Sequence, residues 1–144
     1  MKTVMAIDPG SGKCGIAVVT SDGRILHRQI ASSPCLPNTV AELYERFKPD
    51  AVLVGNGTGA RRARECCLAR IPAEAPVHLV EERFTSVEAR QRYLKDHPPR
   101  GWRRLLPAFA RVPEDPYDDY VAIILAERYF AALTQPGAQP IQGA

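Results

Sequence analysis

The sequence contains no apolar run close to the roughly 20 residues that a membrane-spanning helix needs. The first apolar stretch begins at Val4, which leaves no room for a signal peptide, so we expect a cytoplasmic protein without a membrane partner. Hydrophobic residues nevertheless make up 45% of the 144 residues, and this share excludes an intrinsically disordered chain. A chain of this length suits one domain with its own core, and it shows no internal repeat.

Metal-binding patterns of cysteine and histidine are also missing. The cysteines form no C-x-x-C pair, and their spacing matches no zinc site. We interpret them as small buried residues in a reducing compartment rather than as a disulfide framework. The three histidines share no spacing, so we expect them to be structural.

Lysine is scarce beside arginine, and the net charge of +3 is modest. The arginines gather in two segments, residues 61–70 and 90–111. Their planar guanidinium groups suit phosphate, so the pattern permits a nucleic-acid partner. Solvated helix faces explain either segment equally well when it is taken alone.

The pattern of apolar residues predicts a mixed sheet. Three short-linked strands, expected at 4–8, 15–19 and 24–30, should form an antiparallel meander. The fully apolar stretches at 51–55 and 77–80 are typical of parallel strands. Because the first glycine turn leads into a strand, it does not fit the dinucleotide-binding fingerprint, in which the glycines open a helix.

Helical periodicity separates the later strands. We expect helices at 38–48, 60–69, 85–95 and from 118 onward, a linker at 34–37 and a proline-rich loop at 97–117. Asn38 or Thr39 is a suitable cap for the first helix. The order predicts an α/β protein with a five-stranded mixed sheet and helices on both faces. We assign residues 1–133 to this domain and 134–144 to a flexible C-terminal tail.

Three acidic residues stand where such a fold gathers ligands. Asp8 directly follows the first strand, Glu82 follows the fifth, and Asp118 opens the last helix. If the first and fifth strands lie close, these carboxylates converge, and such oxygen ligands favour Mg²⁺ or Mn²⁺. Taken singly, Asp118 is also a plausible helix cap and Glu82 a surface ion-pair partner. Neighbouring Glu81 and Asp119 leave two of the assignments open by one position.

Further residues flank these acids and are candidates for substrate binding: Gly10, Lys13, Asn56, Thr58, Arg83 and Trp102. Lys13 and Arg83 suit phosphate, although Arg83 is equally placed to position Glu82. Asn56 and Thr58 follow a parallel strand, where ordinary turn chemistry also explains them. Trp102 lies among arginines and is suited either to stacking on a base or to anchoring its loop on the core.

These residues resemble a known family. Segment 8–15, with Asp-Pro-Gly-Ser and a glycine four positions later, resembles the opening motif of the ribonuclease H-like nucleases. The segment from Val80 to Ala89 is similar to the hydrophobic-Asp-Glu-Arg-Leu-Thr-Thr-Val-Glu-Ala motif of the YqgF family, also called RuvX. The expected last helix is similar to the C-terminal helix of that family. The resemblance covers residues 4–130 and implies a ribonuclease H-like fold.

The resemblance also implies an activity. The family is implicated in maturing the precursor of 16S ribosomal RNA and was earlier proposed as a Holliday-junction resolvase. Its three acids carry over to Asp8, Glu82 and Asp118. The sequence departs from the family at Glu81, at segment 56–59 and in the long loop 97–117, which indicates a divergent branch.

Several functions therefore stay open. A metal-dependent nuclease of structured RNA is favoured, with the chain as monomer or homodimer. Cleavage of DNA junctions by the same chemistry would need a dimer that cuts two strands. A non-catalytic nucleic-acid-binding module is the alternative from another class. An actin-like nucleotide site is the weakest, because one domain of this length lacks a second lobe to close over a nucleotide.

Overall fold

The computed structural model describes residues 2–10, 12–57, 59–81, 85–97 and 118–134. A few helical side chains, including that of Asp118, lie outside this description, as do most of loop 97–117 and nearly all of the predicted tail. Among the described residues, no helix combines the length and apolar character needed to cross a membrane.

The five-stranded sheet has the order β3-β2-β1-β4-β5. Its strands are β1 (Thr3–Asp8), β2 (Lys13–Thr20), β3 (Ile25–Ser32), β4 (Ala51–Gly55) and β5 (Val77–Val80). The first three pair antiparallel, and β1, β4 and β5 pair parallel. This arrangement confirms the predicted mixed sheet.

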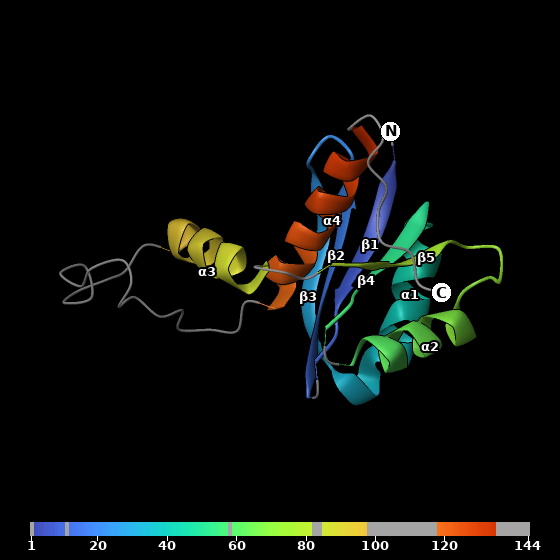
Figure 1. Ribbon diagram of the computed structural model, residues 1–144. Helices are drawn as coiled ribbons and strands as arrows, with labels where there is room; N and C mark the ends of the chain where they lie inside the picture. Colours follow the sequence, from blue (N-terminus) through green and yellow to red (C-terminus); the bar gives the residue numbers. More distant parts are fainter. Residues whose placement is uncertain (1, 11, 58, 82–84, 98–117, 135–144) are drawn as a thin grey trace.

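Helices cover both faces of the sheet (Figure 1). The helices are α1 (Leu36–Phe47), α2 (Ala60–Arg70), α3 (Thr85–Asp96) and α4 (Asp118–Thr134). The pair α1 and α2 packs on one face, α4 packs on the other, and α3 packs on α4 (Figure 1).

The predicted linker at residues 34–37 is wrong. A 3₁₀ helix, η1 (Ser33–Cys35), runs directly into α1, because proline is accepted in the first turn of a helix. The predicted cap is also wrong, since the Thr39 hydroxyl donates to the Cys35 carbonyl rather than closing the N-terminus.

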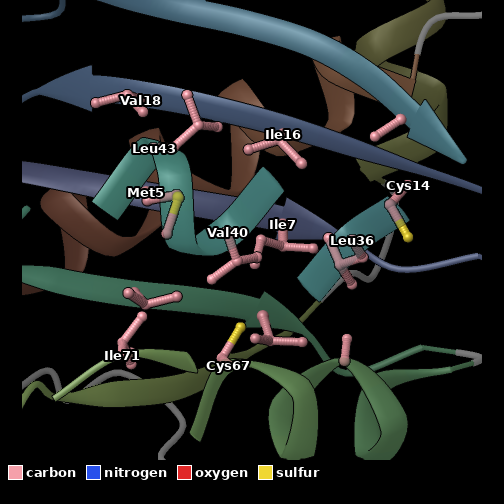
Figure 2. Packing of buried hydrophobic residues seen from close by; sticks show 14 of the residues in the cluster. Met5, Ile7, Cys14, Ile16, Val18, Leu36, Val40, Leu43, Cys67 and Ile71 are labelled. Carbon is pink, nitrogen blue, oxygen red and sulfur yellow. The ribbon is translucent and has the colours of Figure 1, made fainter. Parts of the chain in front are cut away.

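Alternation along β1 divides the core in two. Met5 and Ile7 face α1 and α2 in the cluster that Figure 2 shows, whereas Val4 and Ala6 face α4. All five residues of β4 are buried, as its apolar sequence predicts for a strand covered on both faces. The next even position on β1 is Asp8, which the alternation assigns to the α4 face.

The central helix α4 should dominate stability. Leu125 is fully buried in the cluster that α4 forms with the sheet, so Leu125→Ala is expected to cost about 2–5 kcal/mol of unfolding free energy. Leu133 lies on the same helix but is 46% exposed, so Leu133→Ala should cost well under half as much. Urea unfolding of both variants measures the difference. Equal losses would contradict the packing described here.

Candidate active site

The parallel strands end at one edge of the sheet. Ile7 lies opposite Val54, and Val54 lies opposite Leu79, so Asp8 is level with the last residues of β4 and β5. However, β4 lies between β1 and β5, which corrects the expectation that the first and fifth strands are close. Their ends are two strand spacings apart, roughly 9–10 Å. An acid after β5 therefore meets Asp8 only across the turn that follows β4.

Asp8 is half-buried at the end of β1. Its partner across the antiparallel pair is Gly15, which has no side chain to cover the carboxylate. The motif thus places an acid at the sheet edge opposite a buried glycine. A carboxylate in such a position is of the type that suits a hard divalent cation.

In the turn after Asp8, only glycine fits at position 10. A Cβ on Gly10 would lie 2.4 Å from the Lys13 carbonyl oxygen, closer than real contacts allow. The Ser33 hydroxyl donates to the Gly10 carbonyl at 3.0 Å, and the Ser33 amide donates to the Gly12 carbonyl at 3.0 Å. Lys13 is exposed at the start of β2. The turn is therefore tight at Gly10 and is anchored to η1 by Ser33.

The first turn of α4 is held by a residue that the sequence did not suggest. Arg28 on β3 lies 3.7 Å from the Asp119 carboxylate, and its guanidinium carbon is 4.9 Å from the centre of the Tyr120 ring. The Tyr120 hydroxyl donates to the Asp96 carboxylate of α3 at 3.2 Å. These partners, Tyr120 foremost, raise the pKa of Arg28. Asp119 is thus engaged by Arg28 of β3.

In the sequence, only the pairing register of its strand could have indicated that Arg28 faces α4. Arg28 pairs with Ala17, and Ala17 pairs with Ala6, so all three share the face that α4 covers. That register is knowable only after the strands are paired.

We expect the arginine to stabilise α4 modestly. Arg28→Ala should lower the unfolding free energy by about 1 kcal/mol, because a partly exposed cation–π contact and ion pair are lost together. A double-mutant cycle with Tyr120→Leu, followed by urea unfolding, measures the coupling. Strictly additive losses would show that the two side chains do not stabilise each other.

The other predicted site residues are only partly visible. Thr58, Glu82, Arg83 and Trp102 lie outside the described residues, and for Asp118 only the backbone is described. Asn56 is exposed after β4, and its backbone N–H donates to the Val80 carbonyl at 3.0 Å. No three potential metal-ligating side chains come together within the described part, where Asp8 alone represents the predicted acids.

The histidines and cysteines with perturbed pKa values belong to packing. His78 stacks on Tyr129 with ring centres 5.7 Å apart, and burial lowers the pKa of His78. Burial raises the pKa of the Cys67 thiol to about 12. These groups are neutral near pH 7 and add no charge to the site.

Comparison with known proteins places this architecture. The chain is 29% identical over 151 residues to "Putative pre-16S rRNA nuclease" of Xanthomonas euvesicatoria pv. vesicatoria (strain 85-10), over 96% of this chain and 93% of that protein. It is 35% identical over 97 residues to a protein of the same name from Thermobifida fusca (strain YX), over 59% of this chain and 61% of the relative. No family model matches the chain.

Solved structures share the fold. Thermus thermophilus RuvC superposes with a TM-score of 0.64 and 22% identity, over 96% of this chain and 99% of the other. T. thermophilus RuvC in complex with a Holliday junction substrate gives a TM-score of 0.63 and 19% identity, over 98% and 100%. The sheet order and this likeness show a ribonuclease H-like fold. By sequence, the chain is similar to two proteins that are named as pre-16S rRNA nucleases.

Proposed function

We propose that this protein is a divalent-metal-dependent nuclease that hydrolyses phosphodiesters in structured RNA, with precursor 16S ribosomal RNA as its substrate and the cytoplasm as its location. The observation that carries the proposal is the placement of Asp8, half-buried at the carboxyl edge of the sheet beside a turn that accepts only glycine. Both relatives carry the name of a pre-16S rRNA nuclease, which favours RNA over DNA.

The metal would be held by Asp8, Glu82 and Asp118, whose carboxylate oxygens suit Mg²⁺ or Mn²⁺. Bound there, the metal would supply an activated water and charge stabilisation for phosphodiester hydrolysis. Counting from Val80, which faces α4, alternation favours Glu82 over Glu81. The ion pair between Arg28 and Asp119 favours Asp118 in the same way.

The remaining residues would orient the substrate. The absence of a side chain at Gly10 would help a phosphate backbone to approach Asp8. Lys13 and Arg83 would meet phosphate oxygens, and Asn56 and Thr58 would contact sugar or phosphate beyond β4. Trp102 would stack on an unpaired base.

A matched substrate assay tests the proposal. Purified protein is incubated with a precursor 16S RNA fragment and with a four-way DNA junction, each with Mg²⁺, with Mn²⁺ or with a chelator. We expect metal-dependent cleavage of the RNA and little cleavage of the junction. Faster cleavage of the junction would favour the alternative that the RuvC complex suggests, a structure-selective DNA nuclease.

The non-catalytic alternative has its own readout. Calorimetric titration with Mg²⁺ or Mn²⁺ should show binding that Asp8→Asn removes. RNA binding without any metal binding would overturn the nuclease and leave a nucleic-acid-binding module.

A further inference from the structure

A pocket of about 310 Å³ opens at the same edge of the sheet as Asp8, but on the face covered by α1 and α2. Its walls come from the turn after β1, from η1 and from the first turns of α1 and α2. Pro9, Pro34 and Pro37 supply much of the apolar surface, and Gly10 lies at the boundary with the Asp8 site. The turn at Pro9 and Gly10 thus links the pocket to Asp8, whose side chain belongs to the other face of the sheet.

Charge in the pocket comes from Arg62. It is the one charged side chain among the lining residues that the structure describes. Arg62 is exposed and makes no ion pair with another described residue, whereas its neighbour Arg61 reaches Glu65 at 3.4 Å. Burial raises the pKa of Cys66, so this lining thiol is neutral near pH 7. The lining therefore offers apolar walls and a single unneutralised cation.

This chemistry selects a ligand with a flat apolar body and an attached anion. Pockets that bind small groups are mostly apolar, with a few placed polar groups that fix orientation. Arginine binds phosphate oxygens in a fork. The Ser33 hydroxyl on the pocket wall donates its proton to the Gly10 carbonyl, so it can accept a hydrogen bond from a base edge or a sugar hydroxyl. A nucleotide has both parts, an aromatic base and a phosphate.

The position of the pocket ties it to the reaction site. A Cβ on Gly59, the cap of α2, would lie 3.6 Å from the Pro9 Cβ, so α2 begins directly against the turn that follows Asp8. An RNA strand bound at Asp8 would therefore reach the pocket by crossing the turn at Pro9 and Gly10, which lines the pocket. A base stacked within a duplex cannot enter such a pocket, whereas an unpaired base can.

We propose that this pocket binds one unpaired nucleotide of the RNA substrate beside the scissile phosphate, with the base against the prolines and the phosphate on Arg62. The inference rests on the proposed function. It explains how the protein would select single-stranded segments within structured RNA.

Binding without metal tests the pocket separately from catalysis. Fluorescence anisotropy is measured with a labelled single-stranded RNA hexamer and with the corresponding RNA duplex, in the presence of a chelator. Arg62→Ala should weaken binding of the single strand about tenfold, as loss of a charge-assisted phosphate contact does. Arg61→Ala removes the same charge from the same helix outside the pocket and should weaken binding less than about threefold.

A second variant tests the cavity itself. Cys66→Phe fills the pocket from α2 and should reduce single-strand binding while circular dichroism and thermal melting show a folded protein. Equal effects of Arg62→Ala and Arg61→Ala, or unchanged binding in folded Cys66→Phe, would overturn the pocket. If the protein still cleaves RNA in that case, the proposed nuclease activity holds and only the pocket is refuted. If RNA binding depends on the pocket but no RNA is cleaved, the proposed nuclease activity is refuted instead.

Discussion

Replacing Asp8 by asparagine is expected to abolish metal-dependent RNA cleavage and to leave the protein folded. The amide keeps the shape of the side chain but loses the negative charge that a hard divalent cation requires. Asp8 is the one acid of the proposed site whose side chain the structure describes, and β1 fixes it between two core clusters. The cleavage rate should fall by more than roughly 100-fold, because removing a residue that only supports a metal ligand already costs up to about that much.

The measurement is single-turnover cleavage of labelled precursor RNA with saturating Mn²⁺, alongside a thermal melt. Asp22→Asn is the matched control, because Asp22 is an exposed acid in the turn between β2 and β3, at the opposite end of the sheet. We expect this control to cleave at the parental rate. Cleavage that persists in purified, folded Asp8→Asn protein would refute the role of Asp8.

A methyl group added at Gly10 should damage both stability and activity. The new Cβ would stand 2.4 Å from the Lys13 carbonyl oxygen, and backbone cannot rotate away as a flexible side chain would. Forcing the turn apart should cost about 1–3 kcal/mol, as overpacking does in a fitted core. It would also displace the backbone beside Asp8, where a shift of about 1 Å can reduce the rate roughly a hundredfold.

Gly12→Ala is the control within the same turn. Apart from its two chain neighbours, no described residue has an atom within 4 Å of a Cβ placed there, so the unfolding free energy of Gly12→Ala should differ from the parental value by less than about 0.5 kcal/mol. Urea unfolding and RNA cleavage are compared for the two alanine variants. Similar behaviour of both would show that the tight approach between Gly10 and Lys13 is not essential.

The sequence alone determined the elements and their faces. Apolar runs bounded by turn residues reflect local backbone geometry, so the strands, the mixed sheet and the acid at the end of β1 were all predictable. The chain near Pro34 was not, because proline is compatible both with a linker and with a first helical turn.

The tertiary structure alone decided which distant residues meet. It inserted β4 between β1 and β5, brought Arg28 to the head of α4, and enclosed a pocket behind Gly10. None of these follows from periodicity, because strand order and side-chain contacts depend on the simultaneous packing of the sheet and helices. A local sequence motif was enough to predict the position of Asp8, but the surface around its carboxylate forms only when distant segments pack together.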